Sequence, residues 1–185
     1  MKDTANQSLK IIFYLLILIS IGCSDGRKPW KENEYLPVYT GKDVYSEEDS
    51  VTRTVPVIDR LIHVNKETSI AHKIKILSDS VSEGYFHGLE ISILKLDSAS
   101  GNLVLFLELL EDDDYDGPGS LPMYQSWYDF FQGSSGGINT TIILKETFLQ
   151  RFYKGEWIDA VVFYYGGKEI GEWDHIFLDG MIYRY

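Results

Sequence analysis

The stretch Trp157-Ile158-Asp159-Ala160-Val161-Val162-Phe163-Tyr164-Tyr165 is the strongest indication of fold in this sequence. It is rich in β-branched and aromatic residues and is followed by Gly166-Gly167, which predicts a buried strand that ends in a turn. The segments 89–96 and 103–110 are also apolar and flank a turn-rich stretch, so they predict a β-hairpin. We expect these three strands to lie in one sheet.

Two stretches with the apolar spacing of an amphipathic helix precede the hairpin and the last strand. The first helix is predicted near 67–83, with Asn65 as its cap and Lys73 on or near its solvent side. The second is predicted near 138–153, with Gly155 as its stop. Both halves of the chain therefore follow a helix-then-strand order.

Weaker extended segments come before the first helix. Leu36-Pro37-Val38-Tyr39 predicts a strand, and residues 51–64 predict another, which Pro56 confines to a sheet edge or a bulge. The polar, acidic stretch 42–50 reads as a loop between them, and the aromatic cluster within 124–131 reads as a short helix. The expected fold is α+β, a single mixed β-sheet with two helices packed on one face.

The chain begins with a short apolar segment. Residues 11–23 form this run, which ends at Gly22 and Cys23, the only cysteine, and Lys2 and Lys10 precede it. These features are typical of a secretory signal, and the cysteine at the cut resembles a bacterial lipoprotein signal. The resemblance implies cleavage before Cys23 and acylation of its thiol and amine. A plain membrane anchor, although short for the roughly 20 residues of a spanning helix, and a buried helix are the alternatives.

This signal divides the chain into three parts. Residues 1–22 are the predicted signal peptide, 23–35 the lipidated cysteine and a flexible tether, and 36–185 one folded domain. The net charge of −11 argues against nucleic acid as a partner and against electrostatic docking to anionic lipid. Acylation of the only cysteine would leave no thiol for catalysis, redox chemistry or metal binding.

Several segments between roughly 36 and 170 follow one another in the order strand, helix, hairpin, Gly-Ser loop, helix, strand and turn. They are Val38-Tyr39, Arg53-Thr54-Val55-Pro56-Val57, 68–81, 89–107, 131–137, 147–149, 158–164 and Gly166-Gly167-Lys168. This order resembles the GerMN domain, the spore-germination GerM-type module. The chain departs from that family in 111–126, which looks like an insertion or a remodelled loop, and in the aromatic stretch after Gly171. The resemblance implies a lipoprotein-borne α/β module of the cell envelope with no established catalysis.

An acidic run follows the predicted hairpin. Residues 112–117 match the first half of a calcium loop, D-x-D-x-D-G, which would place the carboxylates of Asp112, Asp114 and Asp116 on one concave side. The twelfth loop position is Met123 instead of the bidentate glutamate, and the preceding segment reads as strand. Two interpretations stay open, a weak calcium site and a solvated acidic loop.

Other candidate chemistry is sparse. No G-x-S-x-G or S-x-x-K motif provides the usual setting of a hydrolytic nucleophile, and the four histidines lack metal-ligand spacing. The Gly-Ser segment 133–137, with Ser134 or Ser135 as a helix cap, could begin the helix or hold an anion. The amphipathic aromatic residues could stack on sugars, form an interface or fill the core. They are Tyr124, Trp127, Tyr128, Trp173, Tyr183 and Tyr185.

We therefore expect an envelope lipoprotein without enzymatic activity, anchored to a membrane through lipidated Cys23. It would bind an envelope protein or peptidoglycan and need no cofactor. The alternative is a lipoprotein that binds calcium or a small ligand weakly through the 112–117 loop. Ser24 replaces the aspartate that retains some lipoproteins in the inner membrane, which points to the outer membrane if the host has one.

Overall fold

The computed structural model describes residues 33–99 and 101–185. Cys23, the predicted signal peptide and the tether up to residue 32 lie outside the described residues. Within this part of the chain, no helix is long and apolar enough to cross a membrane. The elements are β1 (Asn33–Ser46), β2 (Val51–Asn65), α2 (Ile70–Tyr85), β3 (Glu90–Ala99), β4 (Asn102–Leu110), α3 (Trp127–Phe130), α4 (Ser134–Leu149), β5 (Ala160–Tyr165), β6 (Lys168–Glu169) and β7 (Met181–Tyr183).

The main sheet is mixed and is built around β5. This strand pairs parallel with β4 and antiparallel with β6 and β7, and β3 completes the sheet as the antiparallel partner of β4. Both faces of β5 are buried, because Val161 and Phe163 lie in the main core and Ala160 and Val162 in a smaller cluster. The three predicted strands are thus confirmed, and they share one sheet.

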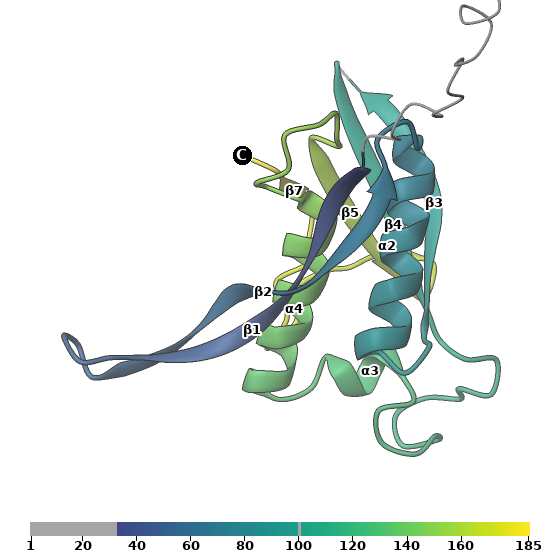
Figure 1. Ribbon diagram of the computed structural model, residues 1–185. Coiled ribbons are helices and arrows are strands. Elements are labelled where there is room, and N and C mark those ends of the chain that lie inside the picture. Colours follow the sequence, from purple (N-terminus) through teal and green to yellow (C-terminus); the bar gives the residue numbers. More distant parts are fainter. Residues whose placement is uncertain (1–32, 100) are drawn as a thin grey trace, which may run out of the picture. The chain divides into compact units, whose positions relative to one another are not determined.

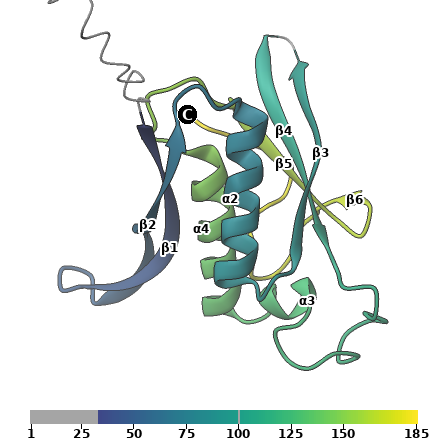
Figure 2. The ribbon, with the colours of Figure 1, turned by 45° about the vertical axis from the view of Figure 1, so that its right-hand side comes forward.

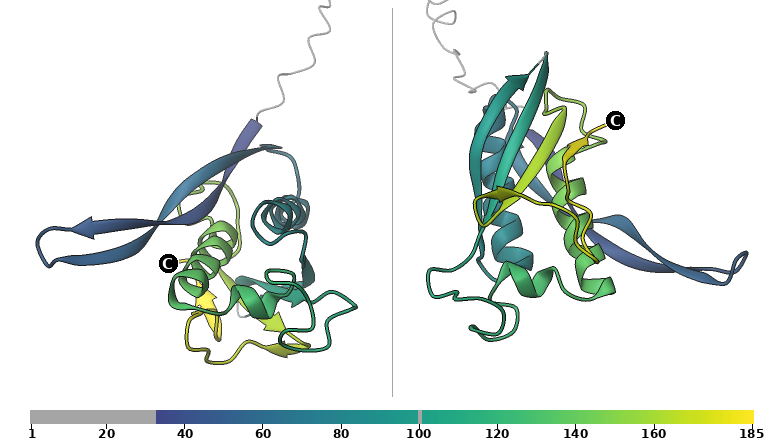
Figure 3. Two further views of the ribbon diagram at one scale, coloured as in Figure 1. Left: turned by 90° about the horizontal axis from the view of Figure 1, so that it is seen from below. Right: turned by 180° about the vertical axis from the view of Figure 1, so that it is seen from behind.

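Helices α2 and α4 pack on one face of this sheet (Figure 2). The β1–β2 hairpin is a separate two-stranded sheet on the other side of the helices, as the view from below shows (Figure 3). Leu36 and Val38 of β1 are fully buried in the same core as Leu77 of α2 and Leu107 of β4. The α+β class, with a mixed sheet and two helices on one of its faces, is confirmed, and the hairpin adds a further layer.

The hairpin is longer than the sequence suggested. The loop predicted over 42–50 is wrong, because β1 continues to Ser46 and pairs with Val51 across the four-residue turn 47–50. Its outer half projects away from the helices and the main sheet (Figure 1). Neither face of this half is buried, so it carries no apolar alternation that would reveal a strand. We call residues 42–55 the arm.

Helix boundaries also differ from the predictions, for local reasons. Asn65 ends β2, and its side chain accepts a hydrogen bond from the Glu67 amide at 2.9 Å. The cap of α2 is Ser69, whose side chain accepts a hydrogen bond from the His72 amide. Gly133, with a φ of 73°, precedes α4, and neither Ser134 nor Ser135 caps it. The predicted short helix in the aromatic cluster is confirmed as α3.

The C-terminal end of α4 is set by Gln150 and not by Gly155. Gln150 adopts a left-handed conformation with a φ of 46°, which stops the helix. Its buried amide donates hydrogen bonds to the carbonyls of Pro37 at 2.6 Å and Thr147 at 2.7 Å. A long-range contact to β1 thus ends this helix, which explains why local sequence did not predict the position.

Candidate functional site

The arm is held at a defined position by polar contacts between β1 and α4. The Tyr39 amide donates to the Thr147 hydroxyl at 3.0 Å, and the Gly41 amide donates to Asn139 Oδ1 at 2.7 Å. A Cβ at Gly41 would lie 2.7 Å from the Thr54 methyl group and 2.8 Å from that same Asn139 oxygen, so a side chain at this position would displace the Asn139 contact. The arm therefore starts from a fixed point on the helix.

Beyond Gly41 the arm exposes apolar and acidic side chains. Val44, Tyr45 and Val51 keep 45%, 59% and 43% of their surface exposed, although large apolar side chains usually find cover. Within the arm, Thr54 donates to Asp43 at 2.7 Å, and Arg53 forms an ion pair with Asp49 in the turn. The arm is stabilised by its own strand pairing and presents both strand edges to solvent.

A partly buried ionic cluster, in which Lys73 is the buried member, joins the start of β1 to α2 and to the segment after α4. Lys73 Nζ donates to Glu34 at 2.8 Å and to the Tyr153 hydroxyl at 3.0 Å, and Tyr153 also hydrogen-bonds Glu34. Lys73 is only 4% exposed, so its predicted solvent-side position is wrong. Glu34 belongs to β1, which begins at Asn33, inside the range predicted as tether.

Hydrogen bonding governs the charge states of this cluster. Burial favours the neutral form of Glu34, but hydrogen bonds from Lys73 and Tyr153 outweigh it and lower the pKa of the carboxyl. Burial also disfavours the charged form of Lys73, but the same partners raise its pKa. The pair is therefore ionised, and it fastens β1 to the helices as a structural contact.

A second cluster is centred on Glu111, just after β4. Its carboxylate accepts hydrogen bonds from the amides of Trp127 at 2.8 Å and Tyr128 at 3.1 Å, and from the Tyr165 hydroxyl at 2.7 Å. Burial, together with the neighbouring Glu111 carboxylate, strongly raises the pKa of Tyr165. The Glu111 carboxylate is therefore occupied by these bonds to the start of α3 and to Tyr165.

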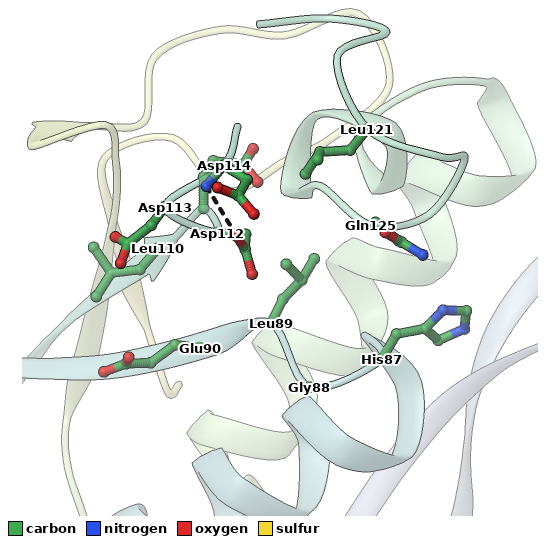
Figure 4. A pocket seen from close by; sticks show the side chains of 11 residues that line it. His87, Gly88, Leu89, Glu90, Leu110, Asp112, Asp113, Asp114, Leu121 and Gln125 are labelled. Carbon is green, nitrogen blue, oxygen red and sulfur yellow. Dashed lines mark hydrogen bonds between the residues drawn. The ribbon is translucent and has the colours of Figure 1, made fainter. Parts of the chain in front are cut away.

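An open hollow of about 480 Å³ lies between the turn after α2 and the acidic loop (Figure 4). His87, Leu89 and Glu90 line one side of the hollow. The segment 110–114 forms one wall, and Leu121 and Gln125 form the other. Three exposed aspartates, Asp112 to Asp114, make this an acidic concave surface. The hollow therefore suits a cationic group.

The structure separates the three aspartates that the calcium motif places together. Asp112 Oδ1 accepts a hydrogen bond from the Asp114 amide at 2.9 Å, and both residues line the hollow. Asp116 does not line it, and its amide donates to Ser120 at 3.1 Å. Among residues 33–99 and 101–185, no three His, Cys, Asp or Glu side chains form a group that could hold a metal ion. Calcium binding by Asp112, Asp114 and Asp116 stays a prediction.

The histidines and aromatic residues divide between core and surface. Of the four histidines, His87 lines the hollow, while His63 packs on Tyr35 with ring centroids 5.4 Å apart. Trp127 is fully buried and packs on Phe86 at 4.6 Å, which fits the core-filling interpretation. The exposed aromatic residues are Tyr35, Tyr45, Tyr124, Phe152, Phe177, Tyr183 and Tyr185.

Sequence reasoning missed the arm and the Glu34–Lys73 pair, which are the two most distinctive features of the hairpin layer. A usable signal for the arm was the β-branched run Val51-Thr52-Arg53-Thr54-Val55, which faces an equally long segment across a polar turn. Comparison with known proteins adds no candidate: no family model, curated protein or solved structure matches the chain.

Proposed function

We propose that this protein is a membrane-anchored lipoprotein of the bacterial cell envelope, with a GerMN-type domain, that binds a protein or cell-wall partner without catalysing a reaction. The observation that carries the proposal is the arm. An isolated two-stranded hairpin is at best marginally stable in water, and the outer half of this one projects away from the helices and the main sheet. By the strand register, Val44 and Val51 lie on one face of the arm and Tyr45 on the other. A partner that closes over both faces would account for the exposure of all three residues and for the length of the strands.

The anchoring of the arm supports the same proposal. Asn139 and Thr147 of α4 fix the position of β1, and the Glu34–Lys73 pair fixes its beginning. A surface that is held at a defined angle binds with a smaller loss of conformational freedom than a free loop does. Lipidation of Cys23 would keep this surface near a membrane, since several acyl chains give stable attachment.

The titratable groups favour a non-enzymatic role. The residues with shifted pKa values in the described part are mostly tyrosines and members of the two clusters around Glu34 and Glu111. Each cluster joins separate elements of the fold, and neither lines the acidic hollow except through Glu111, whose carboxylate is occupied. The shifted pKa values in these clusters are explained by a structural ion pair around Glu34 and by structural hydrogen bonds around Glu111.

The experiment places a photo-crosslinking amino acid at Tyr45 of the full chain in the cells that produce it. A control with the same label at Phe152, which is 76% exposed, tests an aromatic position away from the arm. We expect a discrete adduct from Tyr45 and none from Phe152. A second variant replaces Asp43–Thr54 with Asn-Gly, a favoured two-residue hairpin turn, to join Lys42 and Val55, which are paired in the native hairpin.

This shortened variant should keep its melting temperature and lose the partner. It should not compete with the native chain for adduct formation, whereas an unlabelled native chain should compete fully. Equal adducts from Tyr45 and Phe152, or full competition by the shortened variant, would contradict a binding role for the arm.

A second candidate function is weak binding of calcium or a small cationic ligand at the acidic loop. It is favoured by the position of Asp112, Asp113 and Asp114 on one wall of the hollow. The missing bidentate glutamate limits such a site to weak affinity. Titration calorimetry with calcium separates this function from the arm proposal, because shortening the arm should leave it unchanged.

A further inference from the structure

A second groove, of about 650 Å³, lies between α2 and the first half of β3. Its walls include Asp79 and Glu83 of α2 and the segment from Glu90 to Ile93 of β3. On the far side from β4, β3 pairs with no strand among the described residues. A free strand edge beside a groove is the geometry in which an added peptide strand gains main-chain hydrogen bonds and side-chain contacts together.

A bulge limits how much of this edge can accept a strand. The β3–β4 register shifts between Ile93 and Lys95, and Leu94 at the bulge is 49% exposed. Bulges twist an edge away from regular pairing. The regular free edge is therefore the short segment Glu90–Ile93, which is also the part of β3 that lines the groove.

The charge of the groove is unbalanced. Lys75 forms an ion pair with Asp79, whereas Glu83 and Glu90 have no cationic partner in the described part of the chain. The groove and the acidic hollow meet, because Gly88 and Glu90 line both. A segment that follows β3 toward its start would thus pass from the two glutamates to Asp112–Asp114.

We infer that an extended basic segment of another protein binds here by adding a strand to Glu90–Ile93. Ile91 is buried in the main core, so Glu90 points to the face of the sheet away from α2, whereas Glu83 lies on α2. Basic side chains at neighbouring positions of the segment therefore pair with Glu83 on the helix side and with Glu90 on the other side. One more basic side chain reaches the aspartates of the hollow. A second copy of this chain fits less well, because the chain carries a net charge of −11 and pairing two β3 edges would bring like charges together. The site is separate from the arm, so the two proposals can fail independently.

The test measures binding of the fluorescent octapeptide Lys-Lys-Val-Lys-Lys-Val-Lys-Lys, which carries lysines on both faces of a strand, to the full chain in detergent by fluorescence anisotropy. The double variant Glu83→Lys/Glu90→Lys removes the proposed charge partners. The matched control, Glu67→Lys/Glu172→Lys, changes net charge equally at two exposed glutamates outside the groove. We expect at least tenfold weaker binding for the groove variant and less than a threefold change for the control.

A second peptide separates strand addition from plain charge attraction. The same octapeptide with every backbone amide methylated keeps its charge but cannot donate main-chain hydrogen bonds, so it should bind at least tenfold more weakly. Equal losses in both double variants, or equal binding of the methylated peptide, would overturn the inference. So would a native dimer in light scattering that blocks peptide binding, because the groove would then hold a second copy.

Discussion

Two adjacent glycines at the start of α4 give a sharp test of how the fold is packed. Gly136 and Gly137 both lie in the first turn of the helix, but a Cβ at Gly136 meets nothing within 4 Å. A Cβ at Gly137 would lie 2.3 Å from the carbonyl oxygen of His175, and ordinary contact starts at 3.4 Å. Gly137→Ala therefore forces two backbone segments apart by roughly an ångström.

The hydrogen bonds around this contact explain why the segments resist separation. The Thr141 hydroxyl donates to the Gly137 carbonyl at 2.9 Å and accepts from the Phe177 amide at 3.0 Å. Ile176 and Leu178, in the same segment as Phe177, belong to the main core. Displacing this segment would strain that packing and weaken the hydrogen bond from Phe177.

The magnitude follows from opposing effects. Alanine in place of a helical glycine stabilises by about 0.5–1 kcal/mol, which is the whole effect expected for Gly136→Ala. Overpacking at Gly137 costs about 1–3 kcal/mol, and loss of the Phe177 hydrogen bond costs about 1 kcal/mol more. We expect the two variants to differ by about 2–4 kcal/mol in free energy of unfolding, with Gly137→Ala the less stable. In a domain of this size that difference separates their melting temperatures by roughly 5–15 °C.

Urea unfolding of the full chain in detergent, followed by near-ultraviolet circular dichroism, measures both variants against the native protein. The ring environments of the core aromatic residues supply the signal. Equal stability of the two variants, or a Gly137→Ala protein as stable as the native one, would refute the close contact between α4 and the segment around His175.

Three further predictions concern the ionic pair, the lipid and the acidic loop. Lys73→Met should lower the free energy of unfolding by about 2–3 kcal/mol at pH 7, because it strands the Glu34 carboxylate, whose side chain is 19% exposed. The stabilisation from a carboxyl with a lowered pKa is present above its unfolded pKa of about 4.3 and is lost as the pH falls through its lower folded pKa, so the effect of Lys73→Met should shrink on acidification below about pH 4.3. Lys75→Met, which removes an exposed pair on the same helix, should cost less than about 0.5 kcal/mol, and a pH-independent effect of Lys73→Met would contradict the assignment. Cys23→Ala should abolish incorporation of labelled palmitate and leave the precursor uncleaved or mislocalised, whereas equal labelling rules out lipidation at this residue. Calorimetry should detect no calcium affinity tighter than about the millimolar class, with any signal lost when all three aspartates of 112–117 become alanine; micromolar binding would show that other ligands complete the site.

The local sequence pattern was sufficient to predict an element where burial of one or both faces gives its apolar residues a regular spacing. The run 157–165 is apolar on both faces because β5 lies in the centre of the main sheet, and the helical spacing near 67–83 reflects one buried face of α2. Both elements, and the hairpin of β3 and β4, were predictable from sequence for that reason. Their exact ends were not, because contacts such as that of Gln150 with Pro37 decide them.

The candidate site was predictable only in part. The acidic run 112–117 is visible in the sequence, but its three aspartates do not converge, and the hollow beside them depends on His87–Glu90 from another element. The groove along β3 depends on which strand lies at the edge of the main sheet, and pairing between distant segments decides that. No local spacing encodes this choice.

The sequence by itself determined the α+β class, the two helices, the three main strands and the expectation of a lipidated Cys23. The fold elements follow from the regular spacing of buried apolar residues, and the expected lipidation follows from the apolar run that ends at Cys23. Only the tertiary structure decided that Lys73 is buried beside Glu34 and that residues 42–55 form a projecting arm. The physical reason is the same in both cases, because each depends on a partner that is distant in the sequence. A charge such as Lys73 can be buried when a distant partner compensates it, and an exposed strand is held by pairing with another strand. Neither contact produces a regular spacing of apolar residues in the local sequence.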